Sequence, residues 1–158
     1  MARGMKDSHE RALGLLAVRA RSRRELERRL LAAGFEQAEV DDSLERLERV
    51  GLVDDQAFAR QLVEHAFGNR GDGRRAVASA LAAKGVDPSV ASSVLDELNG
   101  DEQGRADRLA ASRAGRLRSL PPEKAFQRLT GLLLRRGYAP EVARGAARRA
   151  LGIGSGED

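Results

Sequence analysis

Apolar residues recur along the chain at helical spacing, and three segments share one pattern. Each has apolar residues at positions i, i+4 and i+5, followed by a glycine and a large apolar residue. The three copies are residues 26–35, 77–86 and 129–138. Residues at these spacings share one face of a helix, and a glycine just past the last turn can close it. We therefore expect a helix to end at each of Gly34, Gly85 and Gly137.

A second helix is expected after each glycine, and a third in front of each segment. Pro88 and Pro140 stand at expected helix starts, where proline loses no helical hydrogen bond. Helices in front of the three segments are predicted over residues 8–20, 55–68 and 102–118. Ser22 is expected to cap the second helix as part of a capping box, and Asp54 or Asp55 to cap the fourth.

The glycines lie 51 and 52 residues apart, which indicates tandem modules. The predicted fold is all-α, with three tandem three-helix repeats that form an elongated, curved array. The modules are expected over residues 1–52, 53–100 and 101–151, the third being basic, and residues 152–158 are expected to be a flexible tail.

Composition supports helices and an intracellular location. Aromatic residues are only 3% of the chain, so the core must consist of Leu, Val and Ala, and strand-forming residues are scarce. There is no cysteine, which excludes disulfides and cysteine-based zinc sites. No signal peptide or membrane-spanning run is visible. We expect a monomer in the cytoplasm without contact with a membrane.

Positive charge is concentrated in the C-terminal third. Residues 104–151 hold twelve Arg or Lys but only three acids, although the net charge of the chain is +4. Such asymmetry is typical of a surface that meets an acidic partner, and a solvated arginine-rich face would look the same. The arginines expected to contact the partner are Arg105, Arg108, Arg116, Arg135, Arg136, Arg144 and Arg148.

No catalytic or metal-binding pattern is present. His9 and His65 lie in different modules without a companion at ligand spacing. Adjacent acids such as Asp41 and Asp42 point about 100° apart on a helix, so they do not converge as an acid/base pair. The glycine-rich stretch 68–73 lacks the order of a phosphate-binding loop. We expect no enzyme, no metal and no cofactor.

Several motifs together resemble the RecX family. They are residues 17–26 with Leu30 and Gly34, the block Gly51-Leu-Val-Asp-Asp with Phe58, residues 71–77 with Leu81 and Lys84-Gly-Val86, and Arg135-Arg136-Gly137-Tyr138. The resemblance covers residues 10–150, and the third module matches more loosely. Residues of the family signature that we expect to serve the fold are Gly51, Leu52, Asp54, Asp55, Phe58, Gly34, Gly85 and Gly137.

The resemblance implies a function. RecX proteins are three tandem three-helix repeats that bind the RecA recombinase and lodge in the groove of the RecA–DNA filament. They lower recombination, ATP hydrolysis and co-protease activity, and so modulate DNA repair and the SOS response. The family has no cofactor and no catalytic residues.

Two other functional hypotheses are open besides regulation of RecA. One is a non-specific DNA-binding helical protein, because the arginines could follow phosphates in a weak, salt-sensitive manner. The scarcity of aromatic residues argues against base stacking. The other is a helical adaptor for a different partner. We also expect Val53 and Phe58 to enter the core, so that Phe58→Ala would cost about 3–5 kcal/mol.

Overall fold

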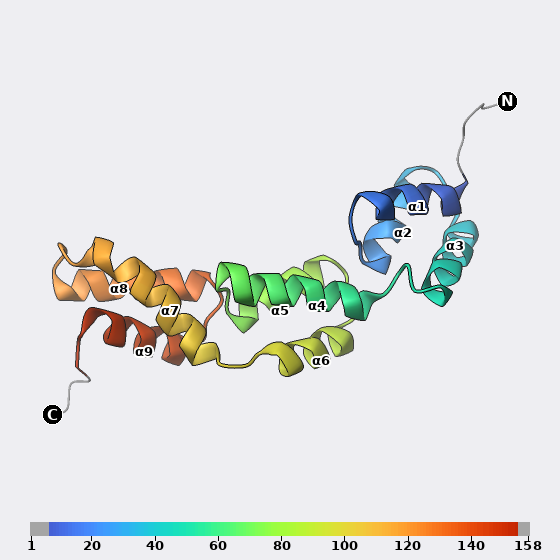
Figure 1. The fold of residues 1–158 in the computed structure, drawn as a ribbon. Coiled ribbons are helices and arrows are strands. Elements are labelled where there is room, and N and C mark those ends of the chain that lie inside the picture. Colours follow the sequence, from blue (N-terminus) through green and yellow to red (C-terminus); the bar gives the residue numbers. More distant parts are fainter. Residues whose placement is uncertain (1–6, 155–158) are drawn as a thin grey trace. The chain divides into compact units, whose positions relative to one another are not determined.

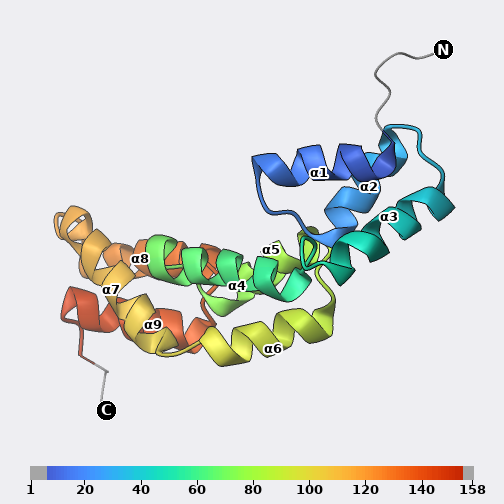
Figure 2. The ribbon, with the colours of Figure 1, turned by 45° about the vertical axis from the view of Figure 1, so that its right-hand side comes forward.

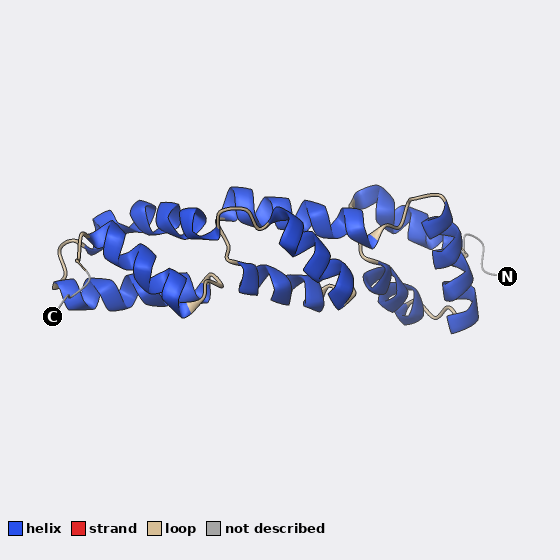
Figure 3. Cartoon of the chain, turned by 90° about the horizontal axis from the view of Figure 1, so that it is seen from below, coloured by secondary structure: helices blue, strands red, loops and turns tan. Residues whose placement is uncertain are grey.

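The structure, a computed structural model, describes residues 7–154. Every regular element in this range is a helix or helical turn, and no strand occurs within it (Figures 1 and 3). The predicted all-α repeat fold is therefore confirmed. No helix in this range is both long and apolar enough to span a bilayer. Most of the expected flexible tail, residues 155–158, lies outside the described residues.

Nine α-helices follow one another in the described range. They are α1 (Ser8–Val18), α2 (Arg23–Ala32), α3 (Gln37–Arg49), α4 (Asp55–His65), α5 (Arg74–Ala83), α6 (Pro88–Leu98), α7 (Glu102–Ala114), α8 (Pro122–Arg135) and α9 (Pro140–Leu151). A π-helical turn, η1 (Ala66–Arg70), extends α4, and a 3-10 turn, η2 (Gly115–Leu117), extends α7. We call α1–α3, α4–α6 and α7–α9 the first, second and third triplets.

The chain forms two compact units. One contains the residues up to 61 together with 81–94, and the other contains 62–80 and all residues from 95 onward. The first triplet lies in one unit and the third in the other, whereas the second triplet contributes to both. The predicted module boundaries and the elongated, curved shape stay predictions.

Helices α1, α2 and α3 lie together (Figure 2), and the core of this first triplet consists mainly of leucine and valine side chains. Leu26 and Leu30 of α2 are fully buried against Val40 and Leu44 of α3. These positions are four residues apart on each helix, so each pair lies on one helical face. Phe35, directly after the glycine turn, packs against the same cluster. Burial of such a side chain contributes about 1.5–3 kcal/mol, which exceeds the weak helix propensity of these short segments.

The core of the third triplet is built mainly from alanine. Ala106, Ala110 and Ala114 form a stripe on α7, and α9 presents its own alanines to the same cluster. Small side chains let two helices approach closely and still fill the space between them. Leu129 and Leu133 of α8 complete the cluster.

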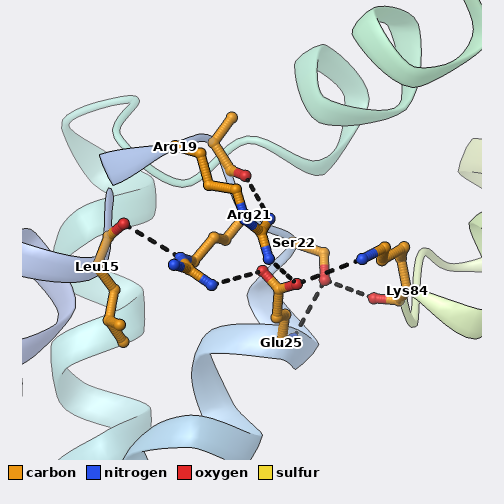
Figure 4. A network of polar contacts seen from close by, with 7 residues as sticks. Leu15, Arg19, Arg21, Ser22, Glu25 and Lys84 are labelled. Carbon is orange, nitrogen blue, oxygen red and sulfur yellow. Dashed lines mark hydrogen bonds and ion pairs between the residues drawn. The ribbon is translucent and has the colours of Figure 1, made fainter. Parts of the chain in front are cut away.

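A first junction joins the N-terminus of α2 to later parts of its unit (Figure 4). The Ser22 hydroxyl accepts a hydrogen bond from the Glu25 N–H at 3.1 Å, so Ser22 caps α2 as expected, and it donates to the Lys84 carbonyl. The Arg23 N–H donates to the Asp55 carboxylate at 2.9 Å. These contacts satisfy two donors that a helix N-terminus otherwise leaves free or solvated.

A second junction repeats this arrangement at the N-terminus of α5, inside the other unit. The Gly73 N–H donates to the Arg136 carbonyl at 2.8 Å, and the Arg74 N–H donates to the Glu102 carboxylate at 3.2 Å. Gly73 lies 51 residues after Ser22, and Arg136 lies 52 residues after Lys84. A Cβ on residue 73 would stand 2.5 Å from the Gly137 carbonyl carbon, which explains the glycine here.

The N-terminus of α8 cannot form a third such junction. In α2 and α5 the N–H of the first helical residue donates to a carboxylate. The first residue of α8 is Pro122, which has no N–H. Helix α8 is also longer, with 14 residues against 10 in α2 and in α5. The third triplet therefore departs from the first two at this position.

Of the expectations about the second triplet, the helix cap is confirmed and the burial of Phe58 needs revision. Asp54, not Asp55, caps α4, since its carboxylate accepts from the Ala57 N–H at 3.1 Å. Val53 is buried as expected, but Phe58 is only partly buried, and the buried phenylalanine is Phe67. The expected cost of Phe58→Ala was therefore too high. The buried residues Ala59, Val63 and Phe67 are four residues apart and share one helical face. Phe58 precedes Phe67 by nine residues, which places it on the opposite face of an ideal helix.

Candidate partner-binding surface on the third triplet

Arg105 is part of the fold, not of the surface. It is only 7% exposed, and its guanidinium lies over the Phe67 ring at 3.9 Å from the centroid. It donates to the Asn99 carbonyl and, at 3.2 Å, to the Asn99 side-chain oxygen. A buried cation needs such compensation. Because this side chain is committed inside the unit, we leave it out of the candidate surface.

Arg136 is also committed, at the second junction. It donates to the Arg70 carbonyl at 2.7 Å and contacts the Asp72 carboxylate at 3.3 Å. The Tyr138 hydroxyl donates to the neighbouring Gly71 carbonyl. Burial raises the pKa of the Tyr138 phenol, so it stays a neutral donor at physiological pH. Both side chains therefore position the turn between α8 and α9.

The remaining expected arginines are exposed, but they do not form one patch. Arg108 and Arg144 are exposed, and no hydrogen bond or ion pair engages their side chains within the described range. Arg148 lies over the Phe126 ring at 5.5 Å and lines a cavity of about 380 Å³ beside Ile153. Arg116 and Arg135 meet at a different place, on the opposite walls of a groove.

This arginine groove lies between the end of α7, η2 and α8, and its volume is about 560 Å³. Its lining residues are Arg113, Arg116, Leu117, Gln127, Arg128, Gly131, Leu132 and Arg135. The contributions follow helical spacing, since positions 128, 131, 132 and 135 share one face of α8. Residue 113 of α7 and residues 116 and 117 of η2 line the facing side of the groove.

The four groove arginines have no partners in the part of the chain that the structure describes. In residues 7–154 no ion pair, side-chain hydrogen bond or ring contact engages Arg113, Arg116, Arg128 or Arg135. By contrast, the nearby Arg149 forms a bidentate contact with Asp107, with N–O distances of 2.9 and 3.2 Å. Four cations without counter-ions around one hollow create a positive potential that attracts anionic groups.

Arg113 and Arg128 were not among the residues expected from sequence. The signal for them was present, because Arg113 and Arg116 are three residues apart and Arg128 and Arg135 are seven apart on a helix that also carries Gly131. The helix predicted over residues 102–118 would carry Arg105, Arg108 and Arg116 together. In the structure the α-helix ends at Ala114, so Arg116 belongs to the 3-10 turn.

The signature residues lie elsewhere and serve local structure. Gly51 ends the first triplet with φ +78°. Asp54 caps α4, and the Asp55 carboxylate accepts from the Arg23 N–H at the start of α2. Leu52 is 53% exposed, so it is not part of a core. The glycine turns at 34, 85 and 137 all have positive φ, as predicted. In residues 7–154 no three His, Cys, Asp or Glu side chains gather in a way that could hold a metal ion.

Two family models match the chain. The model of the first three-helix domain of RecX matches residues 9–47, and that of the second three-helix domain matches residues 54–95. Among curated proteins, the regulatory protein RecX of Mycobacterium sp. (strain JLS) is 41% identical over 144 residues, which cover 87% of this chain and 78% of the relative. That of Mycolicibacterium smegmatis is 43% identical over 136 residues, covering 83% and 72% of the two chains.

Solved structures show the same fold. A crystal structure of RecX from Lactobacillus salivarius superimposes with a TM-score of 0.79 at 20% identity, covering 90% of this chain and 94% of the other. A second crystal structure, of a regulatory protein RecX, gives a TM-score of 0.76 at 20% identity and covers 92% of this chain and 70% of that one.

Proposed function

This chain belongs to the RecX family of regulatory proteins, and we propose that it binds the RecA recombinase and its DNA filament and inhibits them. Inhibition would lower recombinase, ATPase and co-protease activity and so modulate DNA repair and the SOS response. The protein would act without a cofactor, as a monomer in the cytoplasm.

The observation that carries the proposal is the set of uncompensated arginines on the third triplet. The fold uses Arg105, Arg136 and Arg149 internally, yet among the described residues 7–154 the four groove arginines have no partner. Unpaired cations gain little for stability, because surface charges repel one another. Their placement is explained if acidic groups of a partner pair with these arginines, since the attraction between opposite charges also raises the rate of association.

The helical repeat array suits a filament as a target. A filament repeats the same surface, so several helical triplets of one chain can contact successive protomers. Each later contact then forms at high effective concentration, and weak contacts add up to tight binding. This mechanism needs no catalytic residue in the regulator.

The direct test is ATP hydrolysis by RecA from the same cell on single-stranded DNA during titration of this protein. We expect half-maximal inhibition at far fewer copies of the protein than of RecA. An alternative function, favoured by the exposed arginines, is non-specific DNA binding. If inhibition occurs only when the protein saturates the DNA, the result would favour non-specific DNA binding and contradict the proposed inhibition of RecA.

A charge-reversal pair locates the contact surface. The double variant Arg116→Glu/Arg135→Glu should need about tenfold more protein for the same inhibition, because two interface cations become anions. The control Arg28→Glu/Arg49→Glu makes the same charge change at exposed positions of the first triplet. Equal loss in both variants would indicate a general charge effect and would exclude the groove as the contact.

A further inference from the structure

The arginine groove combines charge with an apolar base. Leu117 and Leu132 line it and are partly buried because they also pack against the alanine-rich core. Arg116, Arg128 and Arg135 are exposed at its sides. The leucines therefore form a fixed apolar base, and the guanidinium groups can move above it on their flexible stems.

Gly131 keeps the base of the groove open. It lies in the interior of α8, where glycine costs about 0.5–1 kcal/mol relative to alanine. A Cβ added there would meet only the end of the Arg135 side chain, at 3.3 Å. Packing within the protein therefore does not require glycine here. Its effect is to leave room in the groove, directly beside Leu132.

We propose that the arginine groove is a docking site for an acidic peptide segment of a partner protein, in which carboxylates flank a large apolar side chain. The apolar side chain would lie on Leu117 and Leu132 in the space left by Gly131. The flanking carboxylates would accept charge-assisted hydrogen bonds from the four groove arginines, which hold planar, bidentate donors.

The lining of the groove favours a peptide over a nucleic acid. Phosphate groups would use the arginines but gain nothing from the apolar base, and bases stack on aromatic rings, of which the groove lining has none. A short peptide segment matches both features, since anchoring of apolar side chains in a groove with charged edges is a common mode of peptide recognition.

The inference deepens the proposed function and rests on it, in that it takes the third triplet as the partner-facing surface. It makes a separate claim, because the binding assay below contains neither RecA nor a filament. Loss of peptide binding with intact RecA inhibition, or the reverse, would therefore distinguish failure of one idea from failure of the other.

The test is fluorescence anisotropy of the full chain with a labelled synthetic peptide that has one central leucine flanked by glutamates. A second peptide carries serine in place of the leucine, and a labelled single-stranded oligonucleotide reports DNA binding. The protein variants are Gly131→Leu, which fills the groove but keeps every arginine, and Arg128→Gln/Arg135→Gln, which keeps the groove but removes charge. Arg28→Gln/Arg49→Gln, which removes two exposed arginines of the first triplet, is the control outside the groove.

We expect the leucine peptide to bind the wild type, and both groove variants to weaken it by about tenfold or more. The serine peptide should bind weakly, and Arg28→Gln/Arg49→Gln should match the wild type. Gly131→Leu should leave the affinity for the oligonucleotide unchanged. Circular dichroism checks the fold, and Gly131→Ala, which lacks the bulk, should bind as the wild type does.

Three results would overturn the proposal. Equal affinity for the leucine and serine peptides would show that only charge is recognised. Unchanged peptide binding by Gly131→Leu would place the contact outside the groove. Parallel loss of oligonucleotide and peptide binding in Gly131→Leu would show that the groove holds nucleic acid instead.

Discussion

The first and third triplets share a sequence pattern but use the same positions differently. Gly34 and Gly137 both end the second helix of their triplet, with φ of +97° and +98°. Nothing lies within 4 Å of a Cβ placed on Gly34, whereas Ala76 would lie 2.4 Å from one on Gly137. The turn itself thus requires the positive φ at both glycines. Only Gly137 in the third triplet also needs the absence of a Cβ for close packing against Ala76.

Arginines at equivalent positions of the two triplets also differ in burial. Arg11 and Arg105 are each the fourth residue of the first helix of their triplet. Arg11 is exposed, whereas Arg105 is buried against Phe67 and Asn99. An equivalent helix position therefore does not determine a role, because the role depends on which segment covers the position.

The largest expected effect separates the two glycines. Gly137→Ala should destabilise the protein by about 2–4 kcal/mol, because a left-handed alanine costs about 1–2 kcal/mol and the clash with Ala76 adds a similar amount. Gly34→Ala should cost only the first part, about 1–2 kcal/mol. Chemical denaturation of both variants measures the difference. Equal losses would mean that the contact with Ala76 does not constrain Gly137.

The next effect separates the two arginines. Arg105→Ala should cost about 2–3 kcal/mol, since it leaves the Asn99 oxygens without their donors and uncovers the Phe67 ring. Arg11→Ala should change the free energy of unfolding by less than about 0.5 kcal/mol, as for an exposed residue. Thermal unfolding of the two variants gives both values. A midpoint of Arg105→Ala equal to that of Arg11→Ala would return Arg105 to the candidate surface.

These pairs also show how far sequence can predict this protein. The glycine turns, the proline helix starts and the Ser22 cap were predicted because they depend on backbone chemistry within a few residues. The burial of Arg105 was not, because its partner Phe67 lies 38 residues earlier in the chain. The arginine groove was predicted only in part, because its walls come from two helices whose relative rotation no local pattern specifies.

The smallest expected effect concerns Glu25, whose counterpart in the third triplet is the groove residue Arg128. Glu25 accepts from Arg19 at 2.8 Å and lies 3.7 Å from the Lys84 ammonium at the first junction (Figure 4). Burial acts to raise the pKa of this carboxyl, but the hydrogen bond from Arg19 and the charges of Arg19, Lys84 and Arg21 outweigh it, so the pKa is lowered. The folded state therefore favours the carboxylate.

The sign of the pH dependence follows from this lowered pKa. The stabilisation by Glu25 should be fully present above its unfolded pKa of about 4.3 and disappear as the pH falls through the lower folded value. Its size should stay below about 1 kcal/mol, because Arg19 and Lys84 are each 44% exposed. The difference in unfolding free energy between wild type and Glu25→Gln should thus shrink from pH 7 toward pH 3. Glu45→Gln, at an exposed position, serves as the control. If the difference for Glu25→Gln stays constant with pH, Glu25 contributes hydrogen bonding to the first junction and not charge.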